Sequence, residues 1–123
     1  MKVIATSNAP AALGPYSQAQ VVGNLVFTSG QIGVDPATGA VSESVEGQAH
    51  QVFKNISAIL QAAGSDMSKV VKTTVFVKDM NDFAAVNAIY AQYFSEPYPA
   101  RSCVEVARLP KDFLIECEVI AEI

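Results

Sequence analysis

The sequence predicts a single-domain α+β fold in which two helices cover one face of a mixed β-sheet. The chain has 123 residues, which is the usual size of one domain. Segments with strand and helix patterns follow one another in the order ββ, α, β, α, ββ. Hydrophobic residues make up 50% of the chain and charged residues 16%, against about 25% charged in an average soluble protein. The low charge predicts that surface is buried between copies, so we expect a homo-oligomer.

The first part of the chain has β patterns. Residues 3–6 fit a short strand, and residues 19–22 and 25–28 flank Gly23-Asn24, a two-residue turn suited to a hairpin. Residues 8–16 are rich in Pro, Gly and Ala, which predicts an irregular loop that can carry a side chain over a neighbouring site. Residues 35–39 form a second predicted turn.

Two amphipathic helices are predicted after this turn. The first covers residues 44–63 and is stopped by Gly64, and its apolar positions are Val45, Ala49, Val52, Ile56 and Leu60. The second is expected to be capped by Asn81 and to end before Pro97. Its apolar positions recur every three to four residues, at Phe83, Val86, Tyr90 and Tyr93.

Three further strands complete the predicted sheet. Residues 68–78 are dense in β-branched side chains, which predicts a central strand with Val71, Thr73, Val75 and Val77 on one face. Residues 101–106 and 114–123 fit two more strands, joined by a connection that contains residues 109–112. The face without helices then needs a partner, so we expect that face or its rim to pack against neighbouring copies, with sites between subunits.

Composition and cysteine usage exclude several classes of function. A net charge of −4 disfavours a nucleic-acid groove, which usually has a basic face. Cys103 and Cys117 belong to no CxxC pair and have no spaced histidine partner, which disfavours structural zinc. No apolar run approaches membrane-spanning length and no signal peptide is recognisable, so we expect a cytoplasmic protein without disulfides.

Arg101 is the most informative single residue. In a strand, Arg101, Cys103 and Glu105 project to one face, so Arg101 and Cys103 can share a pocket. The planar guanidinium matches a carboxylate through two parallel hydrogen bonds, which favours a small carboxylic acid as ligand. An ion pair between Arg101 and an acid of the same sheet is the alternative interpretation, and spacing does not decide between them.

The last strand alternates acidic with apolar residues and places Glu116, Glu118 and Glu122 on one side. One of these carboxylates can act as a general base if partial burial raises its pKa, so that it accepts a proton from water near neutral pH. The alternative is a solvated acidic face. Glu116 becomes a catalytic candidate only beside Arg101.

Cysteine catalysis is disfavoured because Cys103 would need a nearby base to form a thiolate, and His50 is the only histidine. We expect His50 to be exposed on the polar side of the first helix, and Cys103 to line a pocket. Ser29-Gly30 follows a strand, and the glycine would bring backbone amides close to a bound anion or carbonyl.

Three further residues can line a small cavity: Tyr16 in the irregular loop, and Asn87 and Tyr90 on the second helix. The alternative for each is a role in packing or capping.

Six short segments follow one another in a specific order and spacing over nearly the whole chain: Ala9-Pro10, Gly14-Pro15-Tyr16, Thr28-Ser29-Gly30-Gln31, Val71-Lys72-Thr73-Thr74-Val75-Phe76-Val77, Pro99-Ala100-Arg101-Ser102 and Val106-Ala107-Arg108-Leu109-Pro110. Together they resemble the RidA (YjgF) family. The resemblance implies a chorismate-mutase-like α+β fold that assembles as a barrel-like homotrimer, with three clefts between adjacent subunits.

The resemblance also implies an activity without cofactor or metal: hydrolysis of 2-iminobutanoate and 2-iminopropanoate to 2-keto acids and ammonia. Pyridoxal-phosphate-dependent threonine and serine dehydratases would supply these imines. By the same resemblance, Arg101 binds the substrate carboxylate with backbone amides around Ser29-Gly30 and Cys103, and Glu116 positions or activates water. Tyr16 closes the cleft, and the pocket walls are Asn87, Tyr90 and Pro110.

Three other functions remain open on the sequence alone. The chain can be a regulatory protein that binds a keto acid or related metabolite without turnover, which would need Arg101 but not Glu116. RNA cleavage or inhibition of translation is disfavoured by the acidic charge. A chaperone-like role that uses apolar surface is neither supported nor excluded by the sequence.

Overall fold

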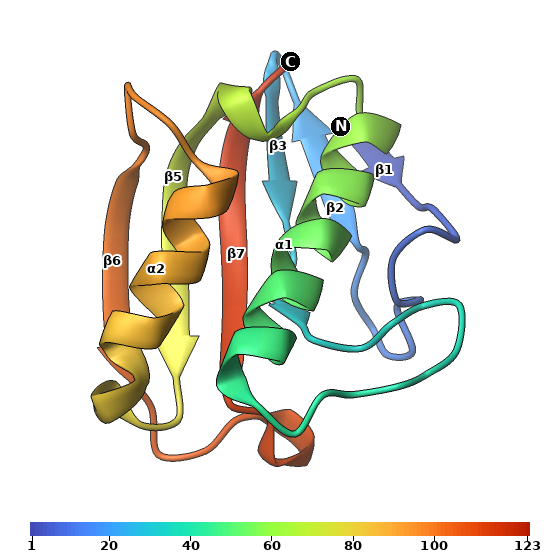
Figure 1. Ribbon diagram of the computed structural model, residues 1–123. Helices are drawn as coiled ribbons and strands as arrows, with labels where there is room; N and C mark the ends of the chain where they lie inside the picture. Colours follow the sequence, from blue (N-terminus) through green and yellow to red (C-terminus); the bar gives the residue numbers. More distant parts are fainter.

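The computed structural model describes residues 1–123 and has one mixed sheet with both helices on one face (Figure 1). The strand order is β1-β2-β3-β7-β5-β6, and the short β4 also pairs with β7. The helices are α1 (Val45–Ala62) and α2 (Phe83–Tyr93), and the strands are β1 (Lys2–Ile4), β2 (Ala19–Val22), β3 (Leu25–Thr28), β4 (Gln31–Ile32), β5 (Val70–Val77), β6 (Ala100–Glu105) and β7 (Ile115–Glu122). Only β5 and β6 run parallel. The predicted α+β arrangement is therefore confirmed.

The predicted hairpin is confirmed residue for residue, with β2 and β3 joined through Gly23, which adopts a φ of 61°. The sequence did not predict β4, because two residues are too few for a recognisable strand pattern. Both β3 and β4 pair with β7, and the register shifts by one residue between Phe27–Ile120 and Gln31–Cys117. This edge of β7 is therefore covered by one strand segment with a bulge at residues 28–30.

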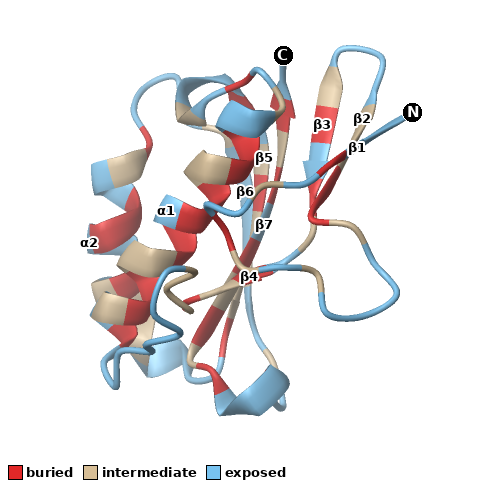
Figure 2. Cartoon of the chain, turned by 90° about the vertical axis from the view of Figure 1, so that its right-hand side faces the viewer, coloured by how far each residue is buried: buried red, intermediate tan, exposed pale blue.

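Helix α1 forms where the sequence predicts it. The Ser44 side chain caps the helix by accepting a hydrogen bond from the Gly47 N–H at 3.1 Å. Its apolar stripe is fully buried against the sheet, as the red segments between the two layers show (Figure 2). Past the C-terminal end, Gly64 takes a φ of 85°, which an L side chain rarely adopts. The predicted stop at Gly64 is confirmed.

The predicted cap of the second helix is wrong. Helix α2 begins at Phe83 after a short 3-10 turn, Met80–Asp82, and the Asn81 side chain is exposed. The Asp79 carboxylate caps that turn by accepting a hydrogen bond from the Asn81 N–H at 2.9 Å. The capping side chain is therefore a carboxylate two residues before Asn81, and it caps the 3-10 turn that precedes the helix.

The predicted faces of the central strand are wrong at one end. Val70 is buried and Val71 is 41% exposed, because the pairing of β5 with β7 shifts register between Val70 and Lys72. From Thr73 onward the alternation follows the prediction, with Thr73, Val75 and Val77 buried. A local irregularity in the ladder moved one side chain to the opposite face.

His50 is half-buried, which corrects the expectation that it is exposed. Its Nδ1 lies 2.8 Å from the Tyr93 hydroxyl, and the two rings meet edge to face with centroids 5.7 Å apart. The two helices pack side by side, so α2 partly covers the polar side of α1.

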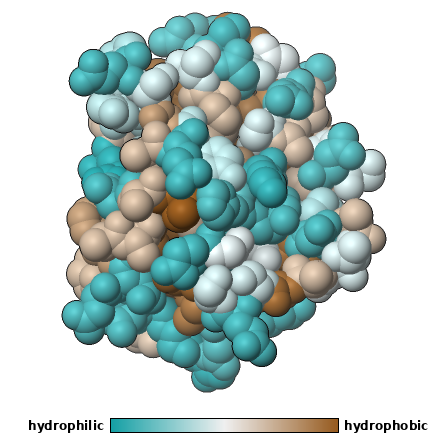
Figure 3. Space-filling view, viewed as in Figure 1, coloured by the Kyte–Doolittle hydropathy of each residue, from teal (hydrophilic) through white to brown (hydrophobic).

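The two faces of the sheet differ in what covers them. A core of 22 buried residues lies between the helices and the sheet. The helix-covered side has hydrophilic residues over much of its surface, with only small strongly apolar areas (Figure 3). On the opposite face several apolar strand residues are exposed: Val3, Val22, Phe27 and Val104. None of the helices combines the length and apolarity needed to cross a bilayer.

Candidate functional site

A cavity of about 630 Å³ lies where the β1–β2 loop, the β3–β4 bulge and the loop before β7 meet. Five of the sequence-predicted site residues line it: Tyr16, Ser29, Gly30, Pro110 and Glu116. These residues come from four separate parts of the chain, so only the folded sheet brings them together. The cavity is a concave site with a few converging polar groups, which is typical of small-molecule binding.

Glu116 is the central ionisable group of this cavity. It is half-buried on β7, on the face opposite the helices. Burial raises the pKa of its carboxyl above the usual value, and the neighbouring negative charge of Glu118 raises the pKa further. Both effects favour proton uptake, so the carboxylate is a better base than an exposed one.

Gly30 leaves room for the Glu116 carboxyl group. A Cβ atom at Gly30 would lie 2.8 Å from Cδ and Oε1 of Glu116, which is closer than real Cβ contacts come. The bulge between β3 and β4 therefore brings the backbone of residues 29–30 directly against the carboxylate. Any larger residue at position 30 would displace one of the two.

Ser29 is held in place by the segment just before β2. Its hydroxyl donates to the Ser17 carbonyl oxygen at 2.6 Å, and its N–H donates to the Gln18 carbonyl oxygen at 2.9 Å. On the other side of the bulge, the Thr28 hydroxyl oxygen accepts from the Val119 N–H at 3.0 Å. Hydrogen bonds to this segment and to β7 thus fix the backbone that borders the cavity.

A second cluster contains the other four predicted site residues: Arg101 and Cys103 on β6, and Asn87 and Tyr90 on α2. Arg101 donates a hydrogen bond from Nη1 to the Asn87 side-chain oxygen at 2.7 Å. Its guanidinium carbon lies 4.7 Å from the centre of the Tyr90 ring, which is itself buried and hydrogen-bonded to the Thr73 hydroxyl at 2.9 Å. The helix therefore holds the arginine in place through an amide and an aromatic face.

Arg101 has no acidic partner within its own chain, and the salt bridge that the chain forms joins Arg108 to Asp112. The ion-pair interpretation of Arg101 is therefore wrong for a single chain, because Asn87 takes the place of an acid. The exposed guanidinium keeps donors for an anionic ligand. Burial raises the pKa of the adjacent Cys103 thiol, so the neutral thiol is favoured over a nucleophilic thiolate.

The two groups of site residues do not meet within one chain. Across the sheet Arg101 lies level with Thr73 and Val119, whose side chains face the helices. Glu116 lies level with Phe76 and Val104 and faces away from the helices. By strand geometry, the row that contains Arg101 and the row that contains Glu116 are roughly 10 Å apart along the strand direction. Across the strands, Arg101 and Glu116 are also roughly 10 Å apart.

Lys111 also lines the cavity wall, and the sequence did not predict it as a site residue. Lys111 and Asp112 both have positive φ values, 54° and 58°, in the 3-10 turn η3 (Pro110–Asp112). The exposed Arg108–Asp112 salt bridge, at 2.8 Å, closes the same turn. The only sequence signal was the connection Leu109-Pro110-Lys111-Asp112, which marked a turn but not its position beside the cavity.

The chain contains no group of three or more His, Cys, Asp or Glu side chains placed to hold a metal ion.

Comparisons with known proteins agree over almost the whole chain. The family model described as Endoribonuclease L-PSP matches residues 6–123. A 2-iminobutanoate/2-iminopropanoate deaminase from Salmonella typhimurium is 62% identical over 123 residues, covering 98% of this chain and 96% of that protein.

Solved structures give the same result. RidA from the Antarctic bacterium Psychrobacter sp. PAMC 21119 superposes with a TM-score of 0.97 at 50% identity, covering 100% of both chains. Escherichia coli TdcF with bound serine superposes with a TM-score of 0.95 at 47% identity, covering 100% of this chain and 99% of that one. In sequence and in fold, this chain belongs to the RidA/YjgF family.

Proposed function

We propose that the protein is an enzyme that hydrolyses small 2-imino acids, 2-iminobutanoate and 2-iminopropanoate, to 2-keto acids and ammonia. The observation that carries the proposal is the 62% identity, over 98% of the chain, to a relative named for this activity. The cavity around Glu116 and the Arg101 cluster supply the groups that the reaction requires, and no step needs a cofactor or metal ion.

Arg101 binds the substrate in this proposal. Its planar fork of N–H donors fits both oxygens of the 2-imino acid carboxylate, and Asn87 and Tyr90 orient the guanidinium. The backbone around Ser29-Gly30 and Cys103 completes the carboxylate site. The relative crystallised with bound serine supports a small carboxylic acid as the ligand.

Glu116 acts on water. It takes a proton as the water oxygen adds to the imine carbon, which gives a tetrahedral carbinolamine. Return of that proton to the nitrogen makes ammonia the leaving group, and Glu116 accepts the hydroxyl proton as the carbonyl bond forms and ammonia leaves. The released ammonia or bulk water then takes this proton and restores the carboxylate. The protonated imine is already electrophilic, so orientation and one general base are sufficient, and such a base contributes about 10²- to 10⁴-fold. The raised pKa of Glu116 suits it to this role.

The complete site forms between two copies of the chain in a barrel-like homotrimer. Two observations support this: Arg101 and Glu116 face opposite sides of one chain, and the face that carries Glu116 also exposes apolar side chains, among them Phe27 and Val104. Packing of that face against a neighbour would bury the apolar residues and bring the neighbour's Arg101 towards Glu116.

The upstream partners in this proposal are pyridoxal-phosphate-dependent threonine and serine dehydratases, whose products are the unstable imines. We place the reaction in the cytoplasm, where the free thiols of Cys103 and Cys117 are chemically stable. RNA cleavage, the activity in the description of the matching family model, is disfavoured by the net charge of −4.

The test is a coupled assay in which a threonine dehydratase generates 2-iminobutanoate and release of the 2-keto acid is followed. Wild-type protein should accelerate release, and Arg101→Ala should abolish the acceleration through loss of carboxylate binding. Glu116→Gln should lower turnover about 10²-fold or more while a 2-keto acid still binds. Lys54→Ala, which removes an exposed positive charge on α1, should behave as wild type.

The variants separate this function from metabolite binding without turnover. A binding protein would lose its ligand in Arg101→Ala, keep full function in Glu116→Gln and never accelerate keto-acid release. Near-normal turnover in either variant would contradict the residue roles.

A further inference from the structure

The β1–β2 loop borders the candidate site but has little backbone structure of its own. It contributes Tyr16 and four other residues to the cavity lining. Within residues 6–16 one backbone-to-backbone hydrogen bond forms, from the Tyr16 N–H to the Gly14 carbonyl oxygen at 2.8 Å. A chain segment of this length without a hydrogen-bond ladder needs another source of order to hold a side chain in place.

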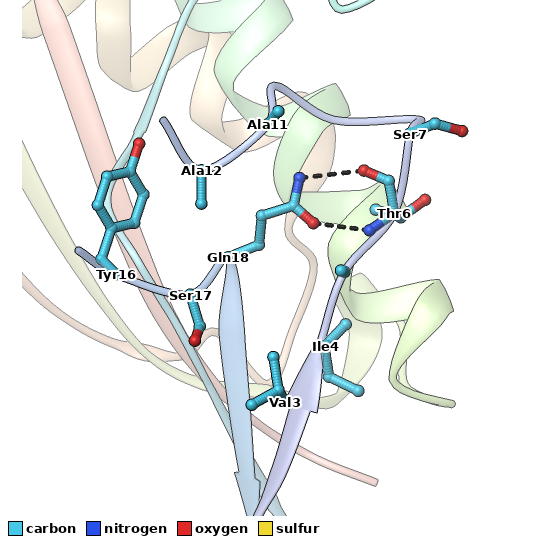
Figure 4. Close-up of a pocket in the computed structure, with 10 residues that line it drawn as sticks. Val3, Ile4, Thr6, Ser7, Ala11, Ala12, Tyr16, Ser17 and Gln18 are labelled. Carbon is cyan, nitrogen blue, oxygen red and sulfur yellow. Dashed lines mark hydrogen bonds between the residues drawn. The ribbon is translucent and has the colours of Figure 1, made fainter. Parts of the chain in front are cut away.

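Packing supplies that order at Ala9, which is buried in the core, but not at Tyr16. A second cavity of about 430 Å³ lies beside the loop, lined by residues of β1 and of the loop up to Gln18 (Figure 4). Tyr16 borders both cavities and is 55% exposed, so its ring does not rest on the core. The position of Tyr16 therefore depends on hydrogen bonds elsewhere in the loop.

The Gln18 side chain supplies those hydrogen bonds. It is buried, with 4% exposure, and both ends of its amide are used. Oε1 accepts from the Thr6 N–H at 2.7 Å, while Nε2 lies 3.0 Å from the Thr6 carbonyl oxygen (Figure 4). Nε2 also lies 2.7 Å from the Pro10 carbonyl oxygen and 3.3 Å from that of Ala9. One side chain thus takes the place of a strand partner for residues 6–10.

Gln18 also connects the loop to the opposite wall of the cavity. Its carbonyl oxygen accepts from the Ser29 N–H at 2.9 Å, and the carbonyl oxygen of the preceding Ser17 accepts from the Ser29 hydroxyl at 2.6 Å. The main chain of Gln18 therefore holds the Ser29-Gly30 backbone, while its side chain holds the loop that leads to Tyr16.

We propose that Gln18 is a positioning residue of this site: its side-chain amide fixes the β1–β2 loop and thereby holds Tyr16 at the cavity wall. The kinetic consequence rests on the function proposed above, whereas the structural consequence does not. Without the amide, the Thr6 N–H and three backbone carbonyl oxygens lose their partner, and the loop moves away from its present place.

Two variants and a control test this role in the full-length protein. Gln18→Met keeps the length of the side chain and removes all four hydrogen bonds. Gln18→Glu keeps the side-chain length and the acceptor for the Thr6 N–H, but it places a carboxylate oxygen where the donor faced three backbone carbonyl oxygens, so it repels them. Ser65→Ala is the control, because it removes a different buried hydrogen bond, to the Glu122 carbonyl oxygen.

Amide hydrogen exchange followed by mass spectrometry gives the structural readout. In peptides covering residues 5–17, the hydrogen-bonded amides of Thr6, Asn8 and Tyr16 should exchange at least tenfold faster in both Gln18 variants, while peptides from α1 and β7 keep their wild-type rates. Ser65→Ala should leave exchange in residues 5–17 unchanged. Wild-type exchange of this loop in both Gln18 variants would overturn the proposal.

A double-mutant cycle with Tyr16 gives the kinetic readout in the coupled assay. Gln18→Met should lower kcat at least tenfold with KM changed less than threefold. In a Tyr16→Phe background the same substitution should lower kcat less than twofold, because the Tyr16 hydroxyl that Gln18 positions is already absent. Independent, multiplicative losses would overturn the link to Tyr16. If wild-type protein does not hydrolyse imines, the proposed function fails and the exchange result alone decides the role of Gln18.

Discussion

Glu116 acquires its chemistry from its immediate surroundings. Burial and the negative charge of Glu118 raise the pKa of its carboxyl, and Gly30 allows the backbone to approach it closely. A base of this kind is active when it is deprotonated, so kcat/KM should fall on the acidic side as Glu116 takes up a proton.

Removal of the neighbouring charge should shift this acidic limb. Glu118 raises the pKa of Glu116, so Glu118→Gln lowers that pKa and keeps Glu116 ionised at more acidic pH. The acidic limb of the kcat/KM profile should therefore move to lower pH. The measurement is a pH profile of the coupled assay, with the dehydratase in excess at every pH. A limb that moves to higher pH, or one that is unchanged, would argue against Glu116 as the titrating group.

Strand alternation predicts which side chains of one strand share a face, and on that basis alone it groups Arg101 with Cys103. It does not predict how the faces of two different strands relate, because pairing and register are set by the whole sheet. Glu116 and Arg101 consequently lie on opposite faces of one chain. The partner of Arg101, Asn87, comes from a helix, so no pattern within the sheet could have identified it.

At the scale of elements, α1 holds the cavity wall through polar residues that face the core. Asn55 is 1% exposed, and its side-chain Nδ2 donates to the carbonyl oxygens of Ile32 and Val34 at 3.1 and 2.9 Å. Ile32 and Val34 both line the cavity. The helix therefore supports the site through hydrogen bonds as well as through apolar packing.

Loss of this support should destabilise the protein measurably. Asn55→Ala leaves the Val34 carbonyl oxygen without a donor, whereas the Ile32 carbonyl oxygen still accepts from the Val34 N–H. The free energy of unfolding should therefore fall by about 1–3 kcal/mol. Urea unfolding at one fixed protein concentration measures the change, since the stability of an oligomer depends on concentration. Gln61→Ala, on the exposed side of the same helix, should stay within about 0.5 kcal/mol of wild type. Equal stability of the two variants would show that the Asn55 bridge is unimportant.

Long periodic elements could be predicted from the sequence, and short or irregular ones could not. The hairpin, α1 and the last strand follow from turn residues and apolar period alone. The bulge that exposes Val71, the two-residue β4 and the Asp79 cap depend on tertiary pairing or on a turn shorter than any period. The buried amides of Gln18 and Asn55 were missed because polar residues in a pattern are assigned to solvent by default.

At the scale of the whole molecule, the sheet face without helices exposes apolar side chains, which predicts that copies of the chain assemble. Light scattering should give a mass near three times the 13.0 kDa chain. The sheet face without helices should then be protected from solvent in the assembled protein, including Phe27, Lys72 and Val104 on or near it. A monomer at micromolar concentration would contradict the shared site.

The most direct test of the central claim mixes two inactive variants. Arg101→Ala and Glu116→Gln chains are unfolded together, refolded at equal amounts and measured in the coupled assay. If each site joins Arg101 of one copy to Glu116 of the next, random mixing restores about a quarter of the wild-type activity, because that fraction of sites has both residues intact. Each variant refolded alone serves as the control and should stay inactive. A mixture no more active than the separate variants would contradict imine hydrolysis at a site shared between copies.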